Sequence, residues 1–405
     1  MGAESSRPAI TRIGVLGAGT MGAGIAQVAA EGGFDTIMHD PIPGASERGL
    51  ARIRGFLERK VEKGQLAADK RDAALAHIHT TGAIRDLGEA GLVVEAIPEE
   101  IGLKREAFRL LDEAAGPATI LASNTSSLSI ARIASATAHP ERVAGLHFFN
   151  PVPLMALVEV VRGPLTQAAV ADSLSEVARR LGKTPVVALD SPGFIVNRVA
   201  RPFYLEALRI VGEGTAGVVE VDGAVREMGF RMGPFELIDT IGVDVNFAVS
   251  RSVFEQFFFE PRYRPHPIQA MILAAGRTGR KAGAGFYDWG ADGSRGSAWA
   301  VLDRRSGGPR PERLSSGQIG ARILATLVNE AASAVADGVA TPESIDRAMR
   351  LGTNYPSGPL EWGERIGLSH VVHTLDALHA AVPDGRYRVV PLLRSLAERN
   401  ASFYA

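Results

Sequence analysis

The 405-residue sequence contains no cysteine. This absence excludes disulfides, thiolate metal sites and a cysteine nucleophile, and it is typical of a reducing compartment. The net charge of −1 gives no overall field that would attract nucleic acid or an anionic membrane. We find no apolar run close to the roughly 20 residues that cross a bilayer. Residues 1–17 carry charge and proline where a secretory signal needs an apolar segment. We therefore expect a soluble cytoplasmic protein.

Short apolar runs alternate with helical segments in the first half of the chain. This pattern predicts a mostly parallel sheet with helices on both faces. The strand-like runs are residues 10–16, 34–40, 91–97, 118–123, 142–149 and 157–162.

The pattern becomes mainly helical near residue 190. Ser191 and Pro192 suit the N-cap and first position of a helix that contains Asn197. Residues 291–317, rich in Gly, Ser, Pro and Arg, are typical of a linker.

The two helical segments resemble each other, which indicates an internal repeat. Four matches occur in register with a single one-residue shift, an arrangement that chance does not favour. They are Glu206-Ala207 with Glu330-Ala331, Asp222 with Asp346, 233–236 with 358–361, and 241–242 with 366–367. We predict a Rossmann-like domain at 1–190, helical domains at 191–290 and 318–405, and a linker at 291–317.

A glycine motif opens the first helical segment directly after the first strand. Gly17 permits a tight turn, Gly19 lets the backbone approach a pyrophosphate, and Gly22 allows the helix to pack closely on the strand. Asp40 lies at the end of the next strand, where a carboxylate can bind both ribose hydroxyls and would repel a 2′-phosphate. The pattern therefore favours NAD over NADP, although Arg48 keeps NADP open.

Polar side chains follow two of the predicted strands and begin the helical region. Ser126 lies after one strand, His147 ends another, and Asn197 lies at the domain boundary. Oxidation of an alcohol needs a base near neutral pH, which histidine can provide. Glu159, in an apolar strand, would orient the imidazole, because an unpaired carboxylate there would be costly. Ser126 and Asn197 would donate hydrogen bonds to the reacting oxygen.

Other interpretations of these residues stay open. His147 could be a core histidine, Glu159 could pair with an arginine, and Ser126, His147 and Glu159 could form a hydrolase triad. The triad lacks the Gly-x-Ser-x-Gly turn and would leave the nucleotide loop unexplained. A non-catalytic NAD-binding scaffold would not need an oriented His–Glu pair. His77 and His79 have no further ligands nearby in sequence, so we expect no metal site and interpret residues 77–79 as the junction of a helix with a strand.

Eight separated motifs resemble, in order and spacing, the L-3-hydroxyacyl-CoA dehydrogenase family. They are GAGTMGAGIAQ, EAIPE, SNTSSL, HFFNPVP, LVEVV, SPGFIVNR, GPFELID and GRKAGAGFYD. The resemblance covers residues 10 to about 290, and the repeated helical segment is similar to the longer members. These include the 3-hydroxyadipyl-CoA dehydrogenases and the dehydrogenase part of multifunctional β-oxidation proteins, beside the shorter 3-hydroxybutyryl-CoA dehydrogenases.

The resemblance implies an NAD-dependent, reversible oxidation of (S)-3-hydroxyacyl-CoA to 3-oxoacyl-CoA in fatty acid metabolism. It implies helical domains like the C-terminal domain of 6-phosphogluconate dehydrogenase, and the roles given above for His147, Glu159, Ser126 and Asn197. The cofactor contacts that the motifs and the resemblance indicate are Gly17, Gly19, Thr20, Met21, Gly22, Asp40, Glu99, Lys104, Asn124, Asn150 and Lys281. Lys60 and Lys63 match a basic stretch near the CoA phosphates, although a solvated helix face explains them equally well.

Two further questions stay open in the sequence. The substrate handle could instead be a carrier protein, or the substrate could be a free hydroxy acid or sugar acid, as in lambda-crystallin-like relatives. The resemblance also implies that the second repeat packs on the first in place of a dimer partner. We expect a monomer with an internal pseudo-dimer, or a homodimer.

Overall fold

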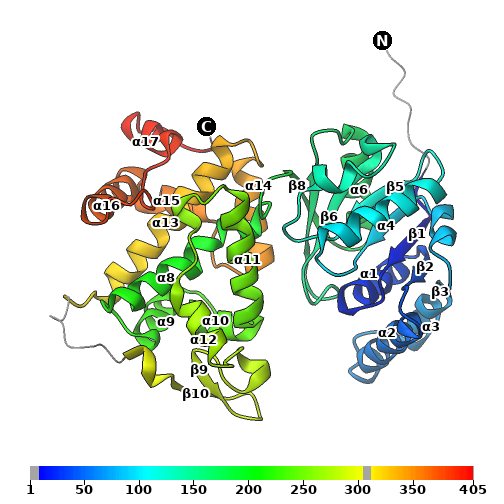
Figure 1. The fold of residues 1–405 in the computed structure, drawn as a ribbon, viewed down its shortest axis with the longest axis horizontal. Coiled ribbons are helices and arrows are strands. Elements are labelled where there is room, and N and C mark those ends of the chain that lie inside the picture. Colours follow the sequence, from blue (N-terminus) through cyan, green and yellow to red (C-terminus); the bar gives the residue numbers. More distant parts are fainter. Residues whose placement is uncertain (1–8, 304–311, 405) are drawn as a thin grey trace. The chain divides into compact units, whose positions relative to one another are not determined.

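The computed structural model describes residues 9–303 and 312–404. The chain falls into two compact units, one ending at Phe194 and the other beginning at Ile195 (Figure 1).

The first unit is an eight-stranded sheet with helices on both faces. The strand order is β3-β2-β1-β4-β5-β6-β7-β8. The strands are β1 Arg12–Leu16, β2 Asp35–His39, β3 Ile78–Thr81, β4 Leu92–Glu95, β5 Ile120–Ser123, β6 Val143–Phe148, β7 Leu157–Arg162 and β8 Thr184–Leu189. The helices are α1 Thr20–Glu31, α2 Ala45–Glu62, α3 Ala68–Ala76, α4 Ile101–Ala114, α5 Ile130–Ala134 and α6 Ala168–Arg180, with 3₁₀ turns η1 Ile84–Glu89 and η2 Pro140–Arg142.

Two apolar cores, one on each face, hold the sheet between its helices. One core includes residues of α1, α2 and α6, and the other includes residues of α4 and α5. All six predicted strands are confirmed. The helix-to-strand junction expected at residues 77–79 is confirmed, because α3 ends at Ala76 and β3 begins at Ile78. The predicted strand-like runs include neither β3 nor β8, which are the two edge strands. Edge strands bury only part of their surface, so their apolar pattern is weak. Strand β8 also contains Pro185, and a proline within an apolar run argues against a strand.

One neighbouring pair in this sheet, β6 and β7, is antiparallel. The segment between them, residues 149–156, is too short for the crossover of a dozen or more residues that a parallel pair needs. The chain therefore turns back directly, and residues of β7 lie opposite residues of β6.

The second unit contains the two helical repeats. The first comprises α7 Val196–Val199, α8 Arg201–Glu213, α9 Val218–Glu227, α10 Pro234–Ile241, α11 Val243–Gln256 and α12 Pro267–Ala274, with η3 Pro261–Tyr263 and η4 Arg280–Ala282. The second comprises α13 Ser316–Ala336, α14 Pro342–Thr353, α15 Pro359–Ile366, α16 Leu368–Ala381 and α17 Pro391–Glu398. Five helices correspond in order, from α8 with α13 to α12 with α17.

The repeats also share an internal hydrogen-bond pattern. Asp222 accepts hydrogen bonds from the first backbone amides of α10, and Asp346 accepts them from the equivalent amides of α15. Tyr287 donates to Asp222 and Tyr404 donates to Asp346. The sequence matches thus mark equivalent structural positions.

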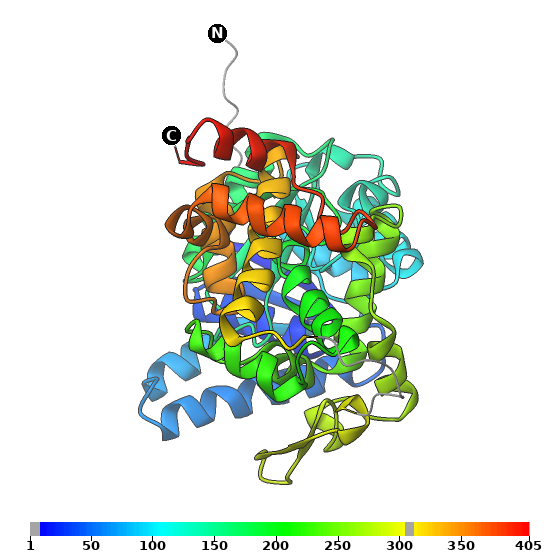
Figure 2. The same cartoon turned by 90° about the vertical axis from the view of Figure 1, so that its left-hand side faces the viewer.

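Reciprocal ion pairs join the repeats within the same chain. Arg198 Nε donates to Glu330 Oε1 at 2.8 Å, and Arg322 donates to Glu206. Arg322 lies 124 positions after Arg198, and Glu330 lies 124 positions after Glu206, so each repeat contributes the equivalent arginine and glutamate. Figures 1 and 2 show α8 and α13 side by side. The predicted packing of the second repeat on the first is confirmed.

Two tyrosines follow the same symmetry. Tyr263 donates to Glu330 Oε1 at 2.5 Å and Tyr387 donates to Glu206 Oε1 at 2.7 Å. Such reciprocity is the property of a two-fold interface, here between two halves of one chain.

Two predictions at the borders of this unit need correction. The helix expected from Pro192 begins only at Val196, because Gly193 (φ 77°) and Phe194 (φ 51°) have left-handed backbone that a right-handed helix cannot include. The predicted linker contains β10 Arg295–Ala298, which pairs with β9 Tyr287–Trp289, and η5 Ala300–Asp303. Residues 304–311 of that linker lie outside the described residues.

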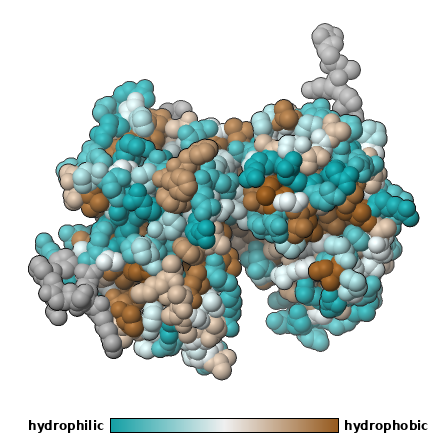
Figure 3. Space-filling view, in the orientation of Figure 1, coloured by the Kyte–Doolittle hydropathy of each residue, from teal (hydrophilic) through white to brown (hydrophobic). Residues whose placement is uncertain are grey.

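Helix α13 corrects the expectation about apolar runs. By length and composition it could cross a membrane, but 83% of its apolar window is buried inside the protein. It carries Arg322 and Glu330, which pair with the first repeat. Hydrophilic residues cover much of the face shown in Figure 3. Burial and pairing identify α13 as a core helix.

The fully buried Glu206 provides a test of the interface between the repeats. Burial alone would raise the pKa of Glu206, but the charges of Arg322 and Arg209 outweigh it and hold the pKa below its usual range. Glu206→Gln should lower the free energy of unfolding by about 3 kcal/mol, because the buried Arg209 loses its carboxylate and Arg322 keeps only the partly exposed Glu213. Urea unfolding would measure the loss.

The control for this prediction is Asp376→Asn, which breaks the exposed pair with Arg394. We expect it to cost less than about 1 kcal/mol. Equal losses in the two variants would contradict the central role of the interface pair.

Candidate active site

The glycine motif forms the turn between β1 and α1. Gly17 has φ 104°, and a Cβ there would lie 2.6 Å from the Ala96 carbonyl oxygen. A Cβ on Gly22 would lie 1.9 Å from the Gly17 carbonyl oxygen. A Cβ on Gly19 would meet nothing within 4 Å, so the space beside this residue is open. Gly19 immediately precedes Thr20 and Met21, the first residues of α1.

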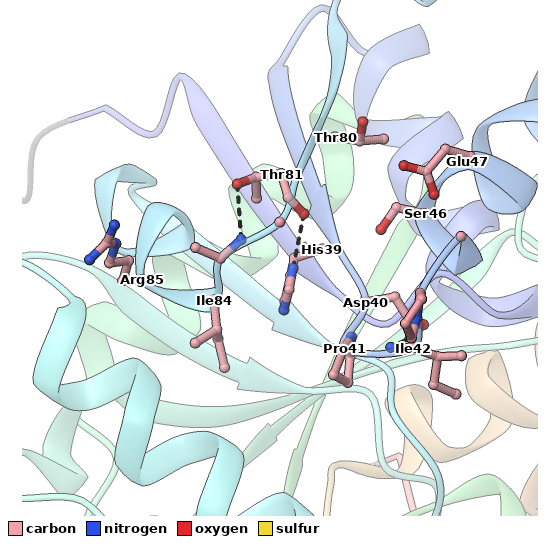
Figure 4. A pocket seen from close by; sticks show the side chains of 14 residues that line it. His39, Asp40, Pro41, Ile42, Ser46, Glu47, Thr80, Thr81, Ile84 and Arg85 are labelled. Carbon is pink, nitrogen blue, oxygen red and sulfur yellow. Dashed lines mark hydrogen bonds between the residues drawn. The ribbon is translucent and has the colours of Figure 1, made fainter.

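Asp40 fixes this loop and borders a cavity. One of its carboxylate oxygens accepts from the Ala18 amide at 2.7 Å and the other from the Ile42 amide at 2.9 Å. The cavity, about 810 Å³, lies beside Asp40 (Figure 4). On its other side, His39 Nδ1 lies 3.0 Å from the Thr81 carbonyl oxygen.

These features fit a dinucleotide. The open face at Gly19 and the free amides at the start of α1 suit a pyrophosphate. The adjacent cavity can receive the adenosine half, with a carboxylate at the ribose. Ser46, Thr80 and Arg85 are among the residues that line it.

The central geometry of the site joins His147 and Glu159. These residues face each other across the antiparallel β6–β7 pair, and His147 Nδ1 lies 2.6 Å from Glu159 Oε2. Both side chains are buried, and the imidazole contacts the Phe149 ring at a centroid distance of 4.4 Å. The carboxylate requires the proton on Nδ1, which leaves Nε2 able to accept one.

The loop after β5 is organised by Glu99. Its Oε1 accepts from the Thr125 hydroxyl at 2.7 Å, the Ser126 amide at 2.9 Å and the Ser126 hydroxyl at 3.2 Å. Burial tends to raise the pKa of Glu99, but the Lys104 charge and these hydrogen bonds hold it below its usual value. Asn124 Oδ1 accepts from the Phe148 amide at 2.8 Å, which joins this loop to the end of β6 beside His147.

Comparison with known proteins identifies the family. The model for the NAD-binding domain of 3-hydroxyacyl-CoA dehydrogenase matches residues 12–191, and the model for its C-terminal domain matches 193–289 and 317–402. The chain is 37% identical to the 3-hydroxyadipyl-CoA dehydrogenase of Escherichia coli K12, over 96% of this chain and 98% of that protein. It is 43% identical to a probable 3-hydroxybutyryl-CoA dehydrogenase of Deinococcus radiodurans, over 69% of this chain and 100% of that one.

The chain belongs to the 3-hydroxyacyl-CoA dehydrogenase family. A crystal structure of 3-hydroxybutyryl-CoA dehydrogenase from Escherichia coli K12 is similar, with a TM-score of 0.89 and 36% identity. The similarity covers 97% of this chain and 99% of that one. The chain is an NAD-dependent dehydrogenase that oxidises the hydroxyl of 3-hydroxyacyl-CoA. The double match of the C-terminal domain confirms the internal repeat.

Lys104, which was predicted to contact the cofactor, is buried in this dehydrogenase. Its ammonium group is buried, and it donates to Glu95 Oε1 at 2.6 Å and lies 3.4 Å from Glu99 Oε2. The Ser123 hydroxyl donates to the other Glu95 oxygen at 2.6 Å. The sequence places Ser123 in the polar segment after the strand at 118–123, but sequence reasoning did not single out Glu95. A charged residue at the end of an apolar strand, as Glu95 is, could have indicated a buried ion pair.

The remaining predicted contacts lie elsewhere in the two units. Lys60 pairs with Glu31 at 2.6 Å, and Lys63 is exposed at the end of α2. Asn150 is exposed after β6 and precedes a cis proline bond. Asn197 lies in α7, and Lys281 pairs with Asp244 at 2.6 Å, both in the second unit.

Asp40→Ser tests the cofactor site. Loss of the charge and of the amide contacts should raise the Kd for NADH about 10- to 100-fold. The preference for NADH over NADPH should become smaller. Fluorescence titration would measure both constants.

Asp35→Ser is the matched control, because it removes a carboxylate at the other end of β2, where it pairs with Arg12. It should leave NADH affinity unchanged. A wild-type enzyme that already prefers NADPH would refute the assignment of Asp40.

Proposed function

We propose that His147 is the general base of this dehydrogenase and that Glu159 is the group that orients it. The observation that carries this proposal is the 2.6 Å contact between His147 Nδ1 and Glu159 Oε2. Nε2 accepts the proton of the substrate hydroxyl, and the carboxylate stabilises the imidazolium that forms. NAD, when bound, accepts the hydride.

Ser126 and Asn197 contact the substrate oxygen in this proposal. Both side chains can donate a hydrogen bond to an oxygen on which negative charge builds up in the reductive direction. The Asn124 bond to the Phe148 amide supports this role, because it ties the Ser126 loop to the end of β6. The Ser126 hydroxyl now donates its single proton to Glu99, so it must turn away from Glu99 to donate to the substrate oxygen.

The proposed cofactor contacts fall into two groups. Gly17, Gly19, Thr20, Met21, Gly22 and Asp40 surround the pyrophosphate and the adenosine. We propose Glu99, Lys104, Asn124, Asn150 and Lys281 for the nicotinamide half, with Lys104 acting from its buried position beside Glu99.

The CoA moiety is assigned to the basic end of α2. Lys63 is exposed and can meet a phosphate, whereas Lys60 would have to leave Glu31 to do so. We expect Lys63 to contribute more of the contact.

Organisation and surroundings complete the proposal. We retain the division into domains 1–190, 191–290 and 318–405, joined in the last case by the segment 291–317. We propose that the enzyme acts in the cytoplasm on a free CoA ester, without nucleic acid or membrane, as a monomer or a homodimer.

His147→Ala tests the base. Turnover of 3-hydroxybutyryl-CoA should fall by at least about 10²-fold, since a general base contributes on that order. NADH affinity should remain, because the nucleotide contacts the glycine loop and Asp40. NADH absorbance and fluorescence would measure the two quantities.

Two controls make this test specific. The exposed His370→Ala should retain full activity. Parallel losses of rate and NADH affinity in His147→Ala would indicate misfolding and refute the role. Turnover of free 3-hydroxybutyrate in preference to its CoA ester would favour the hydroxy acid alternative.

Glu159→Gln tests the orienting group. The neutral amide stabilises an imidazolium poorly, so the rate should fall and the pH–rate profile should differ from that of the wild type. A profile of kcat/KM that coincides with that of the wild type would exclude the pairing.

A further inference from the structure

Arg201 is a buried cation that has no anion among the described residues. Its side chain, at the start of α8, is 4% exposed, and no carboxylate of the described chain pairs with it. The other deeply buried arginines of the repeat interface differ, since Arg198 pairs with Glu330 and Arg322 with Glu206. Burial lowers the pKa of Arg201, and only the tyrosines nearby counteract this effect. An unpaired buried charge is expensive, so its presence calls for a partner.

The guanidinium group retains hydrogen-bonding capacity. Nε donates to the Asn197 carbonyl oxygen at 2.8 Å and Nη1 donates to the Ser250 hydroxyl at 3.2 Å. Nη2 donates to no described residue. A guanidinium has five N–H donors in a fork that matches a carboxylate.

Two tyrosines add hydroxyl groups to the surroundings of Arg201. The guanidinium carbon lies 4.9 Å from the centre of the Tyr204 ring. The hydroxyl of Tyr355, contributed by the second repeat, is buried and has no hydrogen-bond partner in the described protein. Arg201 interacts electrostatically with both tyrosines. The cluster thus contains several donors and lacks an anionic acceptor.

The fold itself does not require this polar cluster. The equivalent positions of the other repeat hold Ala325 for Arg201, Val328 for Tyr204 and Leu375 for Ser250, and all three are buried. The same helices therefore pack with apolar residues at these places. A polar group that packing does not need, and that costs free energy to bury, is best explained by a ligand.

We propose that Arg201, with Tyr355, binds the terminal carboxylate of a dicarboxylic 3-hydroxyacyl-CoA. This inference rests on the proposed contact of Asn197 with the substrate oxygen. Arg201 follows Asn197 by four residues, about one helical turn or 6 Å along the axis, so both lie on one face. An acyl chain whose C3 oxygen meets Asn197 can place a carboxylate a few carbons further at Arg201. The structure thereby assigns substrate specificity to a cluster that both repeats build.

The test compares two substrates that differ only at the far end of the acyl chain. The full-length enzyme should oxidise 3-hydroxyadipyl-CoA with a higher kcat/KM than 3-hydroxyhexanoyl-CoA, by about 10- to 100-fold. In Arg201→Met this preference should disappear because kcat/KM for 3-hydroxyadipyl-CoA falls. The kcat/KM for 3-hydroxyhexanoyl-CoA should change by less than about threefold. Arg201→Lys should restore part of the preference, because it keeps the charge without the fork.

Further variants separate recognition from folding. Tyr355→Phe should lower kcat/KM for the adipyl substrate only, by about fivefold or more, and should leave Tm unchanged, because the hydroxyl has no partner to lose. Arg209→Met, in the same helix, removes an arginine that pairs with Glu206. It should lower Tm without changing the ratio of the kcat/KM values for the two substrates.

The outcomes distinguish this inference from the proposed function. Equal use of the two CoA esters, or a preference for the hexanoyl ester, would overturn the role of Arg201 while the dehydrogenase mechanism stands. A parallel loss of both activities in Arg201→Met, with lowered Tm and no rescue by Arg201→Lys, would also overturn it. Turnover of neither ester would refute the proposed function and the inference together.

Discussion

The antiparallel pairing of β6 with β7 is the constraint on which the proposed catalytic site depends. It places Glu159 directly opposite His147, inside a sheet where an unpaired carboxylate would be strongly unfavourable. The histidine satisfies the carboxylate, and the carboxylate fixes the imidazole. The loops after β4 and β5 meet through the hydrogen bond from Ser126 to Glu99, and Asn124 joins the second loop to the end of β6. A short loop between two strands thus determines the orientation of the site.

The second unit depends on charge in a different way. The interface between its repeats is built from carboxylates that each receive an arginine and a tyrosine of the other half, and the arrangement repeats with exchanged roles. Buried pairs of this kind add specificity of packing, because a displaced helix would leave charges without partners. One copy of the chain thereby contains a symmetric interface.

The symmetry is broken where function would require it. Asn197 corresponds to Ala321, and the cluster around Arg201 corresponds to apolar residues. The second repeat preserves the residues that hold helices together, such as Asp346, and has no counterpart of Asn197 or of the Arg201 cluster. It also contributes Tyr355 to the cluster around Arg201. In the proposed recognition of a dicarboxylic substrate, this residue gives the duplication a role beyond covering an apolar face.

Local sequence patterns determined the parts of this protein that depend on neighbours along the chain. The glycine loop, six strands, the repeat and the pairing of His147 with Glu159 followed from periodicity, turn residues and the cost of a buried charge. The motifs also identified the family, because they keep order and spacing.

Tertiary structure decided what depends on residues distant in sequence. The helix start at Pro192 was wrong, because the left-handed Phe194 is held in the core. Helix α13, long and apolar enough to cross a membrane, is a core helix because helices of both repeats pack against it. The burial of Lys104 beside Glu95 and the isolation of Arg201 were likewise invisible, since a charged residue looks the same in sequence whether its partner is present or absent. Ion pairing depends on which residues lie close together after folding, so only the folded chain shows which charge lacks a partner.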